Sequence, residues 1–335
     1  MSFVYIYEQK TKIGFEENQF ILLTPDEMQR SIPVECLEGV VLFGQIEVTS
    51  RVINRLMEYK IPLTWLSSKG KFFGRLESTE STNIQRQRIQ FRCGENKAFR
   101  LEIGKQFIKG KIQNQKVYLR RCNRTSQNRE VEIFAKQINA YIPKIENAKT
   151  MEELMGYEGT VARYYFQSLA KLMPEAFSFK GRSKRPPKDP FNSLLSFGYT
   201  LLLYDIHTII TNFGLNVYAG FLHKDRKGHP SLASDLMEEW RSVLIDPLVV
   251  SLIHKGMIQE DQFDYDDKQG GVYTDKKAAR TLIQQYTKKT KTLSRYINEI
   301  ERPISFKKGM EHQIQRLIQA MEEEDPSIYQ PIVLR

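Results

Sequence analysis

The residue types that metal-assisted phosphate chemistry needs gather in residues 220–241, GFLHKDRKGHPSLASDLMEEWR. His223 follows an apolar run and begins a polar segment, which indicates a buried element that opens into a loop. A helix is predicted to start at Pro230-Ser231, with the Ser hydroxyl able to cap an early backbone N–H. At about 100° per residue, Asp235 and Glu238 share the side of this helix opposite an apolar stripe. An imidazole and two carboxylates in one segment are candidate ligands for a divalent cation.

A third carboxylate, Glu158, lies in a second helical stretch, GYEGTVARYYF. Its helical neighbours are predicted to face the core, namely Val161, Tyr164, Tyr165 and Leu169. We therefore expect Glu158 to be partly enclosed, and an enclosed carboxylate needs a partner. The alternatives are a solvated acidic face on the helix and a structural His. The sequence contains no phosphate-binding glycine loop, nucleophile elbow or zinc-protease motif.

Composition limits the class of protein that positions these residues. A chain of 335 residues is long for one hydrophobic core, and 41% hydrophobic with 27% charged residues is ordinary for a soluble globular protein. The net charge of +10 favours an anionic partner, nucleic acid first and a membrane surface second. We predict no signal peptide, because the N-terminus lacks a basic start and an uninterrupted apolar run. No stretch is expected to be long and apolar enough to span a bilayer, since the nearest one is broken by Asp205 and His207. Cys36, Cys93 and Cys122 share no metal-ligand spacing, which favours a reduced, cytoplasmic protein.

Two domains and an α+β fold are predicted. Residues 1–80 contain short β-branched and aromatic runs between turn formers, FVYIY, QFILL, GVVLF and IPLTWL, with one helix at TSRVINRLMEYK. This small β domain is expected to serve assembly. The stretch ESTESTN has no apolar residue and is typical of a linker. Residues 86–335 are predicted to form a larger, all-helical catalytic domain.

Basic segments of the second domain are predicted to contact phosphate. Residues 97–124 carry nine Lys or Arg against one acid, with apolar residues interleaved. Such a face can simply be solubilising, but this charge excess favours phosphate binding. A second cluster, KGRSKRPPKDP, contains prolines that keep it extended and mobile. The candidate DNA contacts are Arg163, Arg182, Lys184, Arg185, Lys188 and Lys224.

Local signals place the remaining helices. Thr150 and Glu153 form a capping-box pair. Asp189-Pro190 starts a long apolar helix that Gly214 stops, and this helix is the predicted central core element. The acidic segment QEDQFDYDDKQGGVY lacks the spacing of a calcium loop and is predicted to be a solvated loop. Further helices are predicted from Asp275 to Ile300 and from Ile304 to Met321.

Four motifs, in this order and spacing, resemble the CRISPR-associated integrase of spacer acquisition, the larger subunit of the adaptation machinery. They are YEGTVARYYF, RSKRPPKDPFNSLLSFGYTLLLYD, GFLHKDRKGHPSLASDLMEEWR and GGVY. The resemblance covers the helical half closely and agrees with a small N-terminal β domain. It implies that Glu158, His223 and Glu238 are metal ligands and that Asp235, one turn before Glu238, is a further catalytic residue. Some members carry Asp where this chain has Glu238.

The resemblance also implies an activity and partners. It implies Mg²⁺ or Mn²⁺ as cofactor, a homodimer, a small ferredoxin-like adaptation partner, and a DNA duplex whose 3′-hydroxyl ends are joined to CRISPR repeat DNA by transesterification. A metal-dependent nuclease of repair or replication without an integration role is the alternative. A non-catalytic DNA scaffold is a second alternative, against which Glu158, His223 and Glu238 together argue. We expect Asp235 to orient His223 or hold a metal-bound water, and not to bind the metal directly.

Overall fold

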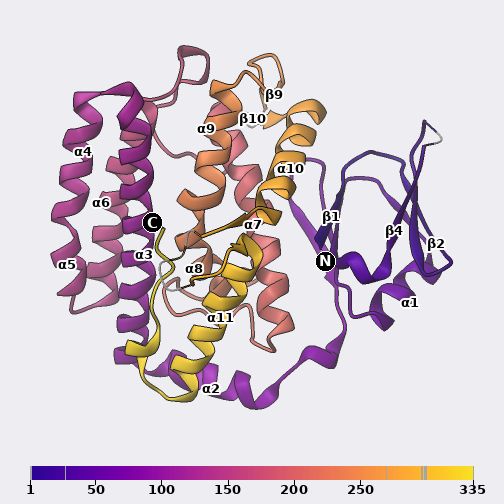
Figure 1. Ribbon diagram of the computed structural model, residues 1–335, viewed down its shortest axis with the longest axis horizontal. Helices are drawn as coiled ribbons and strands as arrows, with labels where there is room; N and C mark the ends of the chain where they lie inside the picture. The colour runs from indigo at the N-terminus through magenta and orange to yellow at the C-terminus, as the bar shows by residue number, and fades with distance from the viewer. Residues whose placement is uncertain (1, 27, 269, 296, 298–299, 335) are drawn as a thin grey trace. The chain divides into compact units, whose positions relative to one another are not determined.

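The computed structural model (Figure 1) describes residues 2–26, 28–268, 270–295, 297 and 300–334. The chain divides into two compact units, Met1–Thr82 and Asn83–Arg335. The first unit is rich in strands and the second is mostly helical, so the predicted α+β class is confirmed.

The described part of the N-terminal unit contains two four-stranded sheets, with the orders β1-β5-β7-β8 and β4-β3-β2-β6. The first sheet consists of β1 (Ser2–Ile6), β5 (Leu37–Phe43), β7 (Leu63–Leu66) and β8 (Phe72–Leu76). The second consists of β2 (Lys12–Glu16), β3 (Gln19–Leu23), β4 (Gln29–Pro33) and β6 (Glu47–Val48). β1, β5 and β7 pair in parallel, whereas β8 is antiparallel to β7.

One helix, α1 (Ser50–Glu58), packs on the N-terminal unit's core. The Thr49 side chain caps it by accepting the backbone N–H of Val52 at 3.3 Å. Val52 and Leu56 are fully buried among strand residues such as Leu42 and Leu63. The four strands and the helix that the sequence predicts are confirmed.

In the helical unit, α3, α4, α5 and α6 lie together on one side, and a set of helices around α7 lies on the other (Figure 1). In the described part of this unit the α-helices are α2 (Ile84–Glu95), α3 (Lys97–Ser126), α4 (Arg129–Ala140), α5 (Ile142–Glu146), α6 (Met151–Ala170), α7 (Pro190–Asn212), α8 (Ser231–Trp240), α9 (Asp246–His254), α10 (Lys276–Lys291) and α11 (Phe306–Glu322). A π-helical turn, Arg241–Ile245, joins α8 to α9. The long helix α3 contacts both α6 and α8. α3 therefore connects the helix of Glu158 with the helix of Glu238.

The core helix α7 begins where the sequence predicts. Asp189 caps it by accepting the backbone N–H of Asn192 at 2.7 Å, and Gly214, with φ +75°, follows its end. By length and composition α7 could cross a membrane, so the prediction that no stretch is long and apolar enough was wrong. The apolar window is 78% buried inside the protein. Asp205, within it, accepts a hydrogen bond from the Tyr286 hydroxyl at 2.7 Å, so this acid is compatible with a core helix.

Two predictions for the C-terminal third were wrong. The acidic segment forms a hairpin of β9 (Phe263–Asp266) and β10 (Gly271–Thr274), in which Phe263 and Val272 are buried whereas Asp264 is exposed. The helix predicted to reach Ile300 ends at Lys291 as α10; β11 (Leu293–Ser294) then pairs with β12 (Ile304–Ser305). Residues 296, 298 and 299 of that prediction lie outside the described residues. The second unit is thus mostly, but not entirely, helical.

Candidate metal centre

Helix α8 carries two of the predicted site residues inside the protein. All ten of its residues are buried, so Asp235 and Glu238 do not lie on a solvated face. The predicted cap is wrong: the Ser231 hydroxyl donates to the carbonyl of His229 at 3.4 Å, because Ser231 is already the first helical residue and Pro230 precedes it. Buried carboxylates need compensating contacts, and both α8 acids have them.

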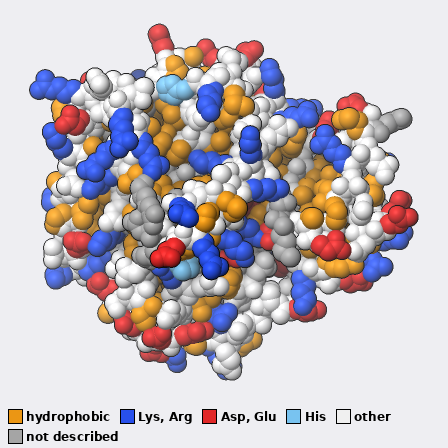
Figure 2. All heavy atoms as spheres, in the orientation of Figure 1, with side chains coloured by type: hydrophobic (Ala, Val, Ile, Leu, Met, Phe, Trp, Pro, Cys, Tyr) orange, Lys and Arg blue, Asp and Glu red, His pale blue; other side chains and the backbone are white. Residues whose placement is uncertain are grey.

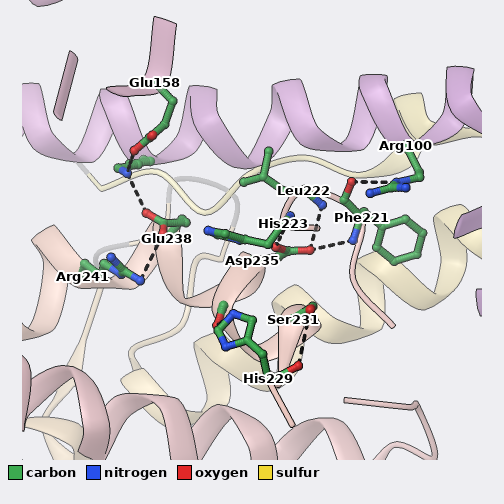
Figure 3. A network of polar contacts seen from close by, with 12 residues as sticks. Arg100, Glu158, Phe221, Leu222, His223, His229, Ser231, Asp235, Glu238 and Arg241 are labelled. Atoms are coloured by element: carbon green, nitrogen blue, oxygen red, sulfur yellow. Dashed lines mark hydrogen bonds and ion pairs between the residues drawn. The ribbon is translucent and has the colours of Figure 1, made fainter. Parts of the chain in front are cut away.

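Asp235 fixes the loop that carries His223 (Figure 3). Its Oδ2 accepts the backbone N–H groups of Phe221 at 2.6 Å and Leu222 at 2.9 Å. Its Oδ1 accepts the backbone N–H of His223 at 3.0 Å and lies 2.6 Å from the Nδ1 atom of the same residue. A Cβ atom on Gly220 would lie 2.7 Å from Asp235 Oδ2, so a larger residue there would disturb this contact. Asp235 is fully buried, and its two oxygens are occupied by these donors.

The contact with Asp235 sets the chemistry of the His223 ring. A carboxylate accepts, so Nδ1 carries the proton and the Nε2 lone pair of the neutral ring can bind a metal. Burial lowers the pKa of His223, but the hydrogen bond and charge of Asp235 and the charge of Glu238 outweigh it and raise the pKa. In Figure 3 the ring extends from Asp235 toward the Glu238 side.

Lys111 of α3 joins the other two predicted ligands. Its ammonium donates to Glu158 Oε1 on α6 and lies 2.7 Å from Glu238 Oε2 on α8. Arg241 Nη2 lies 3.2 Å from the second oxygen of Glu238, Oε1. Burial raises the pKa of the Glu238 carboxyl, but the charges of Arg241, Lys111 and His223 together lower it to about 2. Glu238 is therefore ionised at neutral pH, between two cations.

Arg241 packs against a buried network of aromatic and charged side chains. Its guanidinium lies 4.8 Å from the centroid of the Tyr199 ring, and that of Arg182 lies 5.3 Å from the same centroid. The hydroxyls of Tyr199 and Tyr165 donate to Asp246 at 2.6 and 2.7 Å. Burial raises the pKa of Asp246 to about 6, although these hydrogen bonds and the charges of Arg241 and Arg182 lower it. Arg241 opens the π-helical turn, a feature frequent at functional sites.

The donor set fits a hard divalent cation. Among the described residues, no three His, Cys, Asp or Glu side chains are grouped closely enough to hold a metal. Glu158 and Glu238 instead share the Lys111 ammonium. Glu238 Oε2 is buried and makes no well-aligned hydrogen bond to the described residues; its contact is the ion pair with Lys111. Two carboxylates and one imidazole suit Mg²⁺ or Mn²⁺ and leave positions for water and substrate.

The candidate DNA contacts differ in their surroundings. Arg182 is held inside by Asn192 Oδ1 at 2.8 Å and Ser196 Oγ at 3.1 Å, so at this residue the segment predicted to be mobile is anchored. Lys188 Nζ donates to the Gly270 carbonyl at 2.9 Å. The remaining four candidates are exposed, namely Arg163, Lys184, Arg185 and Lys224. Figure 2 shows a further group of Lys and Arg side chains over α3 and α4.

Sequence reasoning missed two residues of the centre, Lys111 and Arg241. Lys111 was counted with the basic face, yet it is only 6% exposed. A signal existed, because Ile103, Phe107 and Lys111 follow one another at four-residue spacing on one side of α3. Arg241 follows Glu238 by three residues, the spacing of an ion pair on a helix.

Comparisons with known proteins agree with this architecture. Residues 4–288 match the family model described as "CRISPR associated protein Cas1". A "CRISPR-associated endonuclease Cas1" of Mycobacterium tuberculosis is 30% identical over 324 residues, which cover 97% of this chain and 95% of the relative. A "CRISPR-associated endonuclease Cas1 3" of Thermus thermophilus is 37% identical over 238 residues, 71% of this chain and 69% of that protein.

Two solved structures share the fold over almost the whole chain. A chain of a "Cas6-RT-Cas1--Cas2 complex" matches with a TM-score of 0.83 and 26% identity, over 98% of this chain and 36% of that one. A "Casposase bound to integration product" matches with a TM-score of 0.84, over 97% of this chain and 92% of that one. Its 21% identity makes it evidence for the fold alone.

Proposed function

This chain belongs to the Cas1 family of CRISPR-associated proteins, and on that basis we propose that it is a divalent-metal-dependent DNA endonuclease and integrase of CRISPR adaptation. It would insert DNA fragments into a CRISPR array by attack of their 3′-hydroxyl ends. The observation that carries the proposal is the convergence of Glu158 and Glu238 on one ammonium, with the His223 ring directed toward them.

The residues that would hold the metal are Glu158, Glu238 and His223, the last through Nε2. When bound, Mg²⁺ or Mn²⁺ supplies Lewis-acid stabilisation of the charge that develops on the target phosphate. Asp235 keeps the proton on Nδ1 of His223 and fixes the direction of the ring through its 2.6 Å contact. Arg241 compensates the charge of Glu238 and holds its carboxylate in one orientation at 3.2 Å.

The proposed reaction is a direct transesterification. The 3′-oxygen of the incoming strand forms a bond to a phosphorus atom of the repeat, while the bond from that phosphorus to the 3′-oxygen of the repeat strand breaks. The hydroxyl proton leaves the attacking oxygen, and the released oxygen takes up a proton. Water in place of the hydroxyl gives strand cleavage, which is the activity of the alternative, a nuclease of repair or replication.

DNA and protein partners complete the proposal. DNA phosphates would be held, without reading of the base sequence, by the side chains of Lys184, Arg185, Lys188, Lys224 and Arg163. Arg182 would contribute its positive charge from inside the protein. We further propose a homodimer assembled through the N-terminal unit, a cytoplasmic location, and a small ferredoxin-like partner. Support for the last point is that a structural relative, 26% identical, is described as part of a complex with Cas2.

An integration assay tests the function. The protein, with and without its small partner, is incubated with Mg²⁺ or Mn²⁺, a labelled duplex with 3′-hydroxyl ends and a supercoiled plasmid that carries the repeat. We expect label to be joined to the plasmid at the repeat. A duplex with 3′-dideoxy ends is the control and should not be joined. Plasmid cleavage with no joined product in any combination would favour the nuclease alternative.

A further inference from the structure

The position between Glu158 and Glu238 is occupied by a cation that belongs to the protein itself. Lys111 reaches both carboxylates from α3, and its side chain is 8% exposed, against 18% for Glu158 and 5% for Glu238. Burial lowers the pKa of Lys111, but the charges of Glu158 and Glu238 outweigh it and raise the pKa. The amine is therefore charged at neutral pH.

A metal that binds between Glu158 and Glu238 competes with the cations that now contact Glu238. Oε1 contacts Arg241 and Oε2 contacts Lys111. Arg241 is stacked on the Tyr199 ring at 4.8 Å and has a planar guanidinium, which restricts its movement. Lys111 has a flexible four-carbon stem, and its ammonium is the group that Glu158 and Glu238 share. Lys111 is thus the partner that can leave.

We propose that Lys111 is an internal placeholder for the divalent cation: its ammonium keeps Glu158 and Glu238 together before the metal binds, and the metal takes its position by displacing it. The inference rests on the metal site of the proposed function. Metal binding is then an exchange of cations, and its affinity is reduced by the loss of the two ion pairs. Without Lys111, the two carboxylates repel each other and gain more from a metal.

Lys111→Met tests the exchange, because Met keeps the length and the buried stem while it removes the charge. Apparent melting temperature and Mn²⁺ affinity are measured without DNA, by thermal unfolding and calorimetry at one pH. We expect the metal-free variant to melt below the wild type, to bind Mn²⁺ at least tenfold more tightly, and to gain more in melting temperature from Mn²⁺. Lys109→Met is the matched control, since Lys109 lies on the same helix and pairs with Glu146 at 3.0 Å; its Mn²⁺ affinity should equal that of the wild type.

Equal or weaker Mn²⁺ binding by folded Lys111→Met would overturn the proposal. A second measurement on the wild type serves if the variant does not fold: acylation of amines, followed by mass spectrometry, should modify Lys111 faster at saturating Mg²⁺ than without metal. Unchanged protection of Lys111 would equally overturn the proposal. Failure of the wild type to bind Mn²⁺ would remove both the metal site and the exchange, whereas Mn²⁺ binding and exchange without DNA joining would overturn only the integrase function.

Discussion

Replacement of Asp235 by Asn separates the support of His223 from direct metal binding. The two side chains have the same shape, but one carboxylate oxygen becomes an NH₂ group. Each oxygen of Asp235 faces two donors: Oδ2 faces the backbone N–H groups of Phe221 and Leu222, and Oδ1 faces the backbone N–H and Nδ1 of His223. In either orientation, the new NH₂ group points at two groups that donate.

The cost follows from these contacts. A buried donor without its acceptor costs about 1–3 kcal/mol, so an NH₂ group that faces the backbone N–H groups of Phe221 and Leu222 should lower the free energy of unfolding by about 2–6 kcal/mol. If the NH₂ group faces the ring, Nδ1 of His223 must accept, and the proton moves to Nε2, where it blocks metal binding. Loss of a residue that orients a metal ligand typically weakens affinity about 10- to 100-fold.

Chemical denaturation and Mn²⁺ calorimetry on Asp235→Asn measure both effects. We expect reduced stability, about 10- to 100-fold weaker Mn²⁺ binding, and slower joining that high Mn²⁺ partly restores. Asp225→Asn, in the exposed part of the same loop, is the control and should match the wild type. Wild-type stability together with wild-type Mn²⁺ affinity would refute this reasoning, and complete loss of Mn²⁺ binding in a folded variant would instead make Asp235 a direct ligand.

Three further expectations concern chemistry, DNA binding and pH. His223→Ala should abolish metal-dependent cleavage and joining while DNA affinity stays within a few-fold; activity in Mg²⁺ from a variant with a native circular dichroism spectrum would contradict it. DNA affinity should fall with salt by about 0.9 in log–log slope per phosphate contact, and a flat titration would exclude the basic segments as the DNA site. The pKa of Asp246 is raised from 3.8 to about 6 in the folded protein, so the folded state holds this proton more tightly than the unfolded state does. The shift contributes about 3 kcal/mol to the free energy of unfolding; this contribution is complete below pH 3.8 and is lost as pH rises through 6. Asp246→Asn does not titrate, so between pH 4 and pH 7 its unfolding free energy should rise relative to the wild type, and a constant difference would disprove the assigned pKa shift.

Elements with strong local signals could be predicted from the sequence. The capping box is one: Thr150 Oγ1 accepts the backbone N–H of Glu153 at 3.2 Å, at the start of α6. The start of α7 at Asp189 is another. Both depend on residues within one turn of each other, so no knowledge of packing is required. The hairpin at β9 and β10 was missed because its sequence is dominated by aspartates, and the apolar residues that anchor it, Phe263 and Val272, are recognised only by their burial in the folded protein.

The candidate site was predictable only in part, because charge in a sequence does not reveal burial. Residues 97–124 have a real excess of positive charge, but α3 lies between α6 and α8, and this packing turns Lys111 inward. The ligand set was assigned through family resemblance, since Glu158 and Glu238 are separated by 80 positions and no local rule joins them. Their convergence is a property of the helix packing.

The balance of charge at the centre connects metal and DNA binding. In the metal-free site, Glu158 and Glu238 are compensated by Lys111 and Arg241, so the four groups together are neutral. In the proposed exchange, a divalent cation would take the place of the Lys111 ammonium between the carboxylates, so the centre would gain one positive charge in a buried region, which is unfavourable without anions. Phosphates of a bound duplex provide those anions. The same excess charge that opposes a metal in the free protein therefore favours metal and DNA together, and by linkage each should raise the affinity of the other.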